Sequence, residues 1–161
     1  MKAVVILDGE VTSTHSMEAV LERRGFIVLR TRTIDETLQL MKSGAPPIDL
    51  VIAEAPVGDC ASQTQAAVQI HRPYPDVPIL LVSELSLDKW PDDDFLRFEQ
   101  LLSGRIDLLV KPLSQASFVA KANALIYMVS YRESRRLFEN AAAIRSDCRL
   151  SLVQAASGMA L

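Results

Sequence analysis

The sequence predicts an α/β fold in which a parallel sheet is covered by helices on both faces. Short, continuous apolar runs recur along the chain and alternate with segments of helical periodicity. Continuous apolar runs are typical of strands that are buried on both faces of a parallel sheet. Strands that alternate with helices indicate βαβ units with right-handed crossovers. The predicted strands cover residues 3–7, 26–29, 49–54, 78–83 and 106–110.

Local signals mark where the intervening helices begin and end. Gly25 ends the first helix, which spans residues 11–24. Thr33 and Glu36 have the spacing of a capping box and open the second helix, which Gly44 ends. Acidic residues favour a helix start because they complement the positive end of the dipole. The other two predicted helices cover residues 61–71 and extend from the acids at 92–94 to Gly104.

The composition is that of an ordinary globular protein. Its 161 residues are 49% hydrophobic and 23% charged, which favours one domain with room for an extension. The net charge of -3 argues against a nucleic-acid-binding surface spread over the domain. Cys60 and Cys148 lack metal-type spacing, so two free thiols are expected. No apolar run has the length of a membrane span or a signal peptide, so we expect a cytoplasmic protein.

Polar side chains follow four of the predicted strands, at the point where each strand ends. In a doubly wound sheet, ligands and chemistry lie outside the carboxyl ends of the strands. Carboxylates at this edge would hold Mg²⁺, while a lysine and a hydroxyl would hold phosphoryl oxygens. The pattern therefore suits the handling of a phosphoryl group. The residues in question are Asp8, Glu54, Ser83 and Lys111.

The motifs around these residues resemble those of the receiver domain of two-component response regulators, which has the CheY-like fold. The resemblance covers residues 1–128. It implies a doubly wound, five-stranded parallel sheet of order 2-1-3-4-5. Beyond the resemblance, the sequence pattern predicts a helical C-terminal extension over residues 129–161. The matching motifs are Ile6-Leu7-Asp8, Asp49-Leu50-Val51-Ile52-Ala53-Glu54, Pro78-Ile79-Leu80-Leu81-Val82-Ser83 and Gly104-Arg105-Ile106-Asp107-Leu108-Leu109-Val110-Lys111-Pro112.

The resemblance assigns a role to each residue at the strand ends. Glu54 occupies the phosphoacceptor position, where the family has an aspartate that receives phosphate from a histidine kinase. Ser83 matches the switch hydroxyl, and Lys111 matches the lysine that bonds the acceptor. Two acids usually follow the first strand, but here the residues are Asp8 and Gly9. Gly9 replaces the usual direct metal ligand, so Asp8 is the remaining metal candidate.

This sequence differs from the family at the two positions that accept the phosphoryl group and bind the metal, Glu54 and Gly9. Glutamate is one methylene longer than aspartate, and a misplacement of roughly 1 Å costs on the order of a hundredfold in rate. Loss of a magnesium ligand removes charge neutralisation as well. Glu10 extends the acidic pocket of Asp8 but lies one residue further along the chain. We therefore expect a pseudo-receiver without enzyme activity or a cofactor, in which Glu54 is a fixed negative charge facing Lys111. A purely structural Glu54–Lys111 pair is the open alternative.

Three other functions stay open at this level. The chain could be an atypical receiver that a histidine kinase phosphorylates within a phosphorelay. It could be the N-terminal receiver of a longer sensor-kinase-type protein. The hydroxyl-rich residues 12–16 could instead cradle the phosphate of FMN, as in flavodoxin-like proteins. Helix capping by the same hydroxyls is the structural alternative.

The C-terminal extension has the features of a long helix. No Gly or Pro occurs from Ser114 to Ser157. Within residues 129–161, several small or apolar residues fall on one heptad frame, which predicts either a dimerising helix or a tail that folds back. The basic residues of the extension are interspersed with acids, so nucleic-acid binding is not expected. Expected partners are a histidine kinase or an output domain, and a second copy of the chain. The heptad residues are Leu137, Ala141, Ile144, Cys148 and Ala155.

Overall fold

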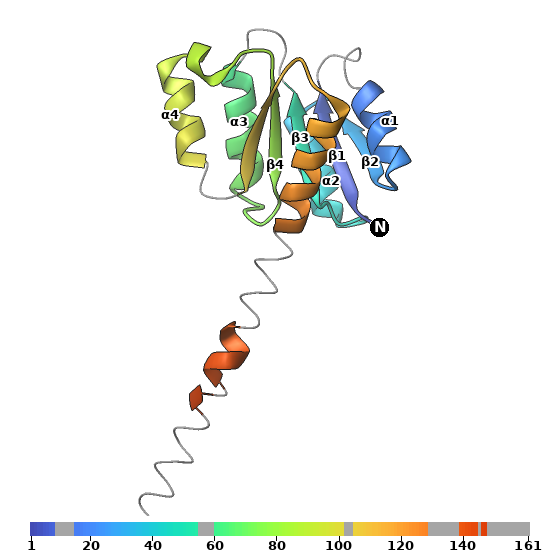
Figure 1. The fold of residues 1–161 in the computed structure, drawn as a ribbon, viewed down its shortest axis with the longest axis vertical. Coiled ribbons are helices and arrows are strands. Elements are labelled where there is room, and N and C mark those ends of the chain that lie inside the picture. Colours follow the sequence, from blue (N-terminus) through green and yellow to red (C-terminus); the bar gives the residue numbers. More distant parts are fainter. Residues whose placement is uncertain (9–14, 55–59, 102–104, 129–138, 145, 148–161) are drawn as a thin grey trace, which may run out of the picture. The chain divides into compact units, whose positions relative to one another are not determined.

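A computed structural model describes the chain from residue 1 to residue 147, apart from several segments. The residues outside the description are 9–14, 55–59, 102–104, 129–138, 145 and 148–161. The chain divides into two units, Met1–Ile126 and Tyr127–Leu161. The first unit contains the whole sheet (Figure 1).

The sheet has five parallel strands in the order β2-β1-β3-β4-β5, which confirms the order that the resemblance implied. The order means that the chain starts near the middle of the sheet, adds β2 on one side and then builds towards the other side. The strands are β1 (Ala3–Asp8), β2 (Ile27–Thr31), β3 (Leu50–Glu54), β4 (Ile79–Ser83) and β5 (Ile106–Val110).

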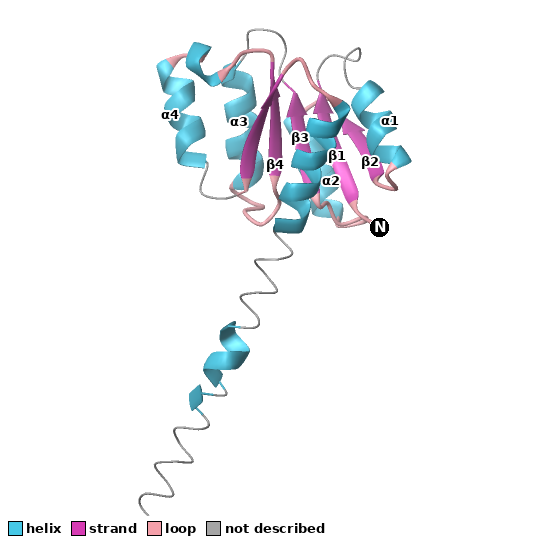
Figure 2. Ribbon diagram, in the orientation of Figure 1, coloured by secondary structure: helices cyan, strands magenta, loops and turns pink. Residues whose placement is uncertain are grey.

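Helices cover both faces of the sheet (Figures 1 and 2). The first helix, α1, and the helix over residues 115–128 pack on one face, whereas α2, α3 and α4 pack on the other. This arrangement confirms the doubly wound α/β fold. The remaining helical elements are α1 (His15–Arg23), α2 (Ile34–Ser43), α3 (Cys60–His71), a short 3-10 helix η1 (Leu87–Lys89) and α4 (Asp92–Leu101).

The burial of the strands explains their continuous apolar sequences. All six residues of β1 and all five of β3 and β4 are buried. Alternate residues of each strand contribute to two separate core clusters, one on each face of the sheet. In one cluster, Phe118 packs with β-strand residues and α1; in the other, Ile70 and Phe98 do so from α3 and α4. Because both faces are covered, no strand position facing a helix layer can be polar without a partner.

The predicted ends of α2 are present. The Thr33 hydroxyl accepts a hydrogen bond from the Glu36 N–H at 3.1 Å, as in a capping box. The Glu36 carboxylate accepts from the N–H of Arg32 at 2.8 Å, one residue before the cap. Gly44 follows the helix with φ of 66°, a left-handed conformation that favours glycine. These caps fix where α2 lies between β2 and β3.

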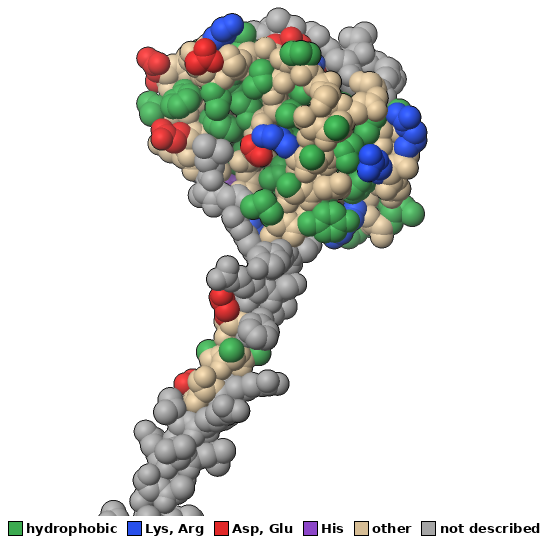
Figure 3. Space-filling view, viewed as in Figure 1, with side chains coloured by type: hydrophobic (Ala, Val, Ile, Leu, Met, Phe, Trp, Pro, Cys, Tyr) green, Lys and Arg blue, Asp and Glu red, His purple; other side chains and the backbone are tan. Residues whose placement is uncertain are grey.

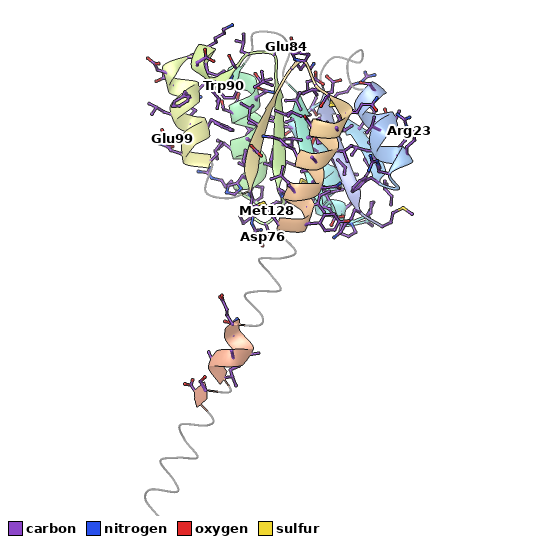
Figure 4. The ribbon with its side chains drawn as sticks, viewed as in Figure 1. Arg23, Asp76, Glu84, Trp90, Glu99 and Met128 are labelled. Atoms are coloured by element: carbon purple, nitrogen blue, oxygen red, sulfur yellow. The ribbon has the colours of Figure 1, made fainter. Side chains whose placement is uncertain are left out.

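Trp90 lies in the segment between β4 and α4 and covers the core (Figure 4). Its ring is 5% exposed and packs against Phe98, with ring centroids 5.4 Å apart. Its Nε1–H donates to the carbonyl of Leu85 at 3.0 Å. The loop after β4 is therefore tied to the core by a buried aromatic residue.

The C-terminal residues are described only in part. In the helix over residues 115–128, the apolar residues Phe118, Ala122 and Leu125 are buried against the sheet. Residues 139–144 are helical, and Ile144 is 64% exposed. The heptad residues Leu137, Cys148 and Ala155 lie outside the described residues, so the dimerisation helix stays a prediction. None of the helices in the described ranges is long and apolar enough to span a membrane.

Candidate functional site

Two carboxylates lie side by side at the carboxyl edge of the sheet. Asp8 ends β1 and Glu54 ends β3, and the two residues are register partners in the parallel ladder. Both are buried, with exposed fractions of 7% and 8%. The parallel sheet therefore brings together acids that are 46 residues apart in sequence, since 54 − 8 = 46. Buried carboxylates require a positively charged or hydrogen-bonding partner.

Lys111 supplies that partner for Glu54. Its Nζ donates a hydrogen bond to Glu54 Oε1, and the side chain of Glu54 is 4% exposed while that of Lys111 is 20% exposed. The backbone N–H of Lys111 donates to the carbonyl of Ser83 at 2.8 Å, which holds the residue at the end of β5. The Lys111-Pro112 peptide bond is cis. The contact expected between Glu54 and Lys111 is therefore present in the structure.

Glu84 also belongs to the site, although it was not among the residues predicted from the sequence. Its Oε1 lies 3.3 Å from Lys111 Nζ, so the one ammonium group bonds two carboxylates (Figure 4 labels Glu84). Glu84 directly follows Ser83, at the same edge of the sheet. Its position just past the end of β4 was the available signal, because charged residues at strand ends face the same edge. At 38% exposure, Glu84 is the more accessible of the two carboxylates that bond Lys111.

The Ser83 hydroxyl is engaged with its own loop. It donates to the carbonyl of Leu85 at 2.9 Å and accepts from the N–H of Leu85 at 3.1 Å. The same carbonyl accepts the Nε1–H of Trp90. Ser83 is thus close to Lys111 through the backbone, while its side chain stabilises the turn that leads to Trp90.

Comparisons with solved structures agree with the fold. A two-component response regulator from Clostridium difficile has a TM-score of 0.60 at 20% identity, over 79% of this chain and 97% of that chain. A CheY-like receiver domain protein from Methanospirillum hungatei JF-1 has a TM-score of 0.65 at 15% identity, over 82% and 98%. A receiver protein from Sinorhizobium medicae WSM419 has a TM-score of 0.62 at 20% identity, over 80% and 96%.

The chain has the receiver-domain fold. In sequence, no protein-family profile and no curated protein matches it. Identities of this size show the fold alone.

Asp8 also lies beside a cavity at this edge of the sheet. Asp8 lines a hollow of about 350 Å³ together with residues of β2 and α2. Gly9 and Glu10, as well as the hydroxyl residues 12–14, lie outside the described residues. The acidic pocket formed with Glu10 and the phosphate cradle for FMN therefore stay predictions. The other lining residues of the hollow are Arg30, Thr31, Arg32 and Glu36.

A magnesium ion is poorly matched by the carboxylates that the structure describes. Among the described residues, no three His, Cys, Asp or Glu side chains come together in a way that could hold a metal ion. The ammonium of Lys111 bonds both Glu54 and Glu84, so it already neutralises part of their charge. Mg²⁺ requires near-octahedral oxygen ligands, and Asp8 and Glu54 supply at most part of such a set.

The surface around α4 differs from the buried site in character. Hydrophobic side chains gather over α4 beside acidic ones, as Figure 3 shows, and they include Phe95 and Leu96. Leu108 of β5 is buried in the core on the same side of the sheet.

Proposed function

We propose that this chain is a receiver-type signalling module that works without phosphorylation and without catalysis. Glu54 acts as a permanent negative charge at the phosphoacceptor position, and Lys111 holds it there. The observation that carries the proposal is the buried Glu54 carboxylate hydrogen-bonded to the Lys111 ammonium. A signalling partner, either a histidine kinase or an output domain, would bind a surface that this fixed pair keeps in one conformation.

The charges around Glu54 support this proposal. Asp8, Glu54 and Glu84 carry three carboxylates at this edge, and Lys111 is the cation that bonds two of them. A phosphoryl group adds a charge of about -1.5 to -2 at neutral pH. Adding it beside existing carboxylates without a bound divalent cation is unfavourable, because like charges in a partly buried site repel one another.

The fixed pair also resembles part of a phosphorylated site. A carboxylate that always carries its charge keeps Lys111 in the position that would otherwise depend on a phosphoryl group. It lacks the three phosphoryl oxygens, so it reproduces the charge and not the full set of hydrogen bonds. We propose that this bias keeps the module in an active-like conformation.

Treatment with acetyl phosphate and Mg²⁺, followed by intact-mass measurement, tests the proposal. We expect the wild-type chain to gain no phosphoryl mass, because the acceptor is displaced and already bonded to Lys111. The matched variant is E54D/G9D, which restores the family's residues at both positions and is expected to gain one phosphoryl group. Phosphorylation of wild-type Glu54 would show that the chain is an atypical phosphoacceptor instead.

A second candidate function is self-association through residues 129–161. Part of this segment is described as helical, over residues 139–144, and its apolar Ile144 is exposed. An exposed apolar residue on a helical heptad frame favours a coiled-coil partner. We expect light scattering to give a dimer for the full chain and a monomer for a chain that ends at Ser130. Equal monomer masses for the two chains would rule the tail-driven dimer out.

A further inference from the structure

Strand β5 is the last strand of the described sheet, and one of its sides has no neighbouring strand there. Towards β4, the hydrogen bonds use the carbonyl of Arg105 and the N–H of Lys111. Successive residues of a strand direct their backbone groups to opposite sides. The backbone groups of the odd-numbered residues from Arg105 to Lys111 therefore face β4. Those of the even-numbered residues Ile106, Leu108 and Val110 point towards the outer edge.

Leu108, the middle one of these three residues, has both of its backbone groups bonded by side chains. Asp107 Oδ1 accepts a hydrogen bond from the Leu108 N–H at 2.7 Å. Lys121 Nζ, from the helix over residues 115–128, donates to the Leu108 carbonyl at 2.7 Å. The same ammonium donates to Asp107 Oδ1 at 3.2 Å, which links the two side chains. Together they occupy the donor and the acceptor that Leu108 would offer to an added strand.

Stability alone does not account for this arrangement. The side chains of Lys121 and Asp107 are 38% and 45% exposed, and exposed ion pairs contribute little to folding. An uncovered strand edge, in contrast, is a template for pairing with another chain, and proteins cover such edges with charged side chains. The geometry fits this second role, because each side chain bonds the backbone of the edge as well as its partner.

We propose that Asp107 and Lys121 block strand addition at β5. When these two side chains no longer bond Leu108, the edge of β5 pairs with β5 of a second copy of this chain. A two-fold axis at Leu108 would place the two strands antiparallel. The N–H and carbonyl of Leu108 would then bond those of Leu108 in the other copy, and Ile106 would face Val110. The edge is therefore complementary to itself, with an acceptor for every donor.

Sedimentation velocity of the full chain, over a series of protein concentrations, tests the proposal. The D107A/K121A variant leaves the net charge unchanged and is expected to form a discrete species of twice the wild-type mass. We expect its dissociation constant to be at least about tenfold lower than that of wild type, since bonds to Leu108 become available. Amide hydrogen exchange of Leu108 should slow as the protein concentration rises, which association through the C-terminal residues would not cause.

Three further variants separate backbone blocking from other effects. D76A/R105A removes an ion pair of 2.7 Å that does not cover the outer edge, and it should keep the wild-type mass. D107N keeps an oxygen acceptor for the Leu108 N–H and should also keep that mass. Adding V110P to D107A/K121A removes an edge N–H and should abolish the association. A wild-type mass for D107A/K121A at every concentration, or association without protection of Leu108, would overturn the proposal.

Discussion

Replacing Lys111 with methionine is expected to lower the free energy of unfolding by about 3 kcal/mol. The substitution removes the ammonium that bonds Glu54 while leaving the carboxylate buried, with 4% of its side chain exposed. A buried charge that loses its ion-pair partner is strongly destabilising, because less of its desolvation cost is then compensated. Urea denaturation followed by circular dichroism measures the change.

The double variant E54Q/K111M shows whether the negative charge of Glu54, without the Lys111 ammonium, causes the loss of stability in K111M. Glutamine has nearly the size of glutamate but carries no charge, so most of the lost stability should return. Lys111→Arg is a weaker control, because a guanidinium differs from an ammonium in shape and in hydrogen-bonding geometry. If E54Q/K111M is as unstable as K111M, the effect of Lys111 comes from packing and the proposed fixed charge at Glu54 loses its support.

Replacing Trp90 with alanine is expected to lower the free energy of unfolding by about 4 kcal/mol. The ring is buried against Phe98, and its removal leaves a cavity between α4 and the loop after β4. The loss should also loosen the turn at Leu85, whose carbonyl bonds both Trp90 and Ser83. Circular dichroism in urea is the suitable measurement, because Trp90 is the one tryptophan of the chain and its fluorescence disappears with it.

Trp90→Phe is the matched control for this variant. Phenylalanine fills most of the volume but cannot donate to the Leu85 carbonyl, so a loss of about 1 kcal/mol is expected. The carbonyl keeps its bond from the Ser83 hydroxyl, which limits the cost. A loss in W90F as large as that in W90A would mean that the hydrogen bond, and not the buried ring, holds the loop.

The fold was predictable because local signals in this sequence agree with the tertiary arrangement. Strands buried on both faces must be apolar at nearly every position, so β1, β3 and β4 appear directly as apolar runs. Thr33 and Gly44 set the ends of α2 through bonds within a few residues of themselves. Interactions of this short range leave a pattern in the sequence.

The composition of the site was only partly predictable. Glu54 and Lys111 follow strands whose carboxyl ends share one edge, so their proximity follows from the topology. Glu84 was not predicted as part of the site, because its ion pair with Lys111 depends on the direction of its side chain, which the strand pattern does not give. Ser83 was placed at the correct strand end, yet its hydroxyl bonds Leu85 because the local turn brings that residue closer.

The sequence by itself determined the parallel α/β sheet, its strand positions and the presence of Asp8, Glu54, Ser83 and Lys111 at the ends of its strands. Only the tertiary structure decided that Lys111 bonds both Glu54 and Glu84, that Trp90 covers the core, and that side chains bond the backbone of Leu108 at the edge of β5. The physical reason is the range of the forces involved. Periodicity and capping act between neighbours in the chain, whereas these contacts form between elements that the completed sheet brings together.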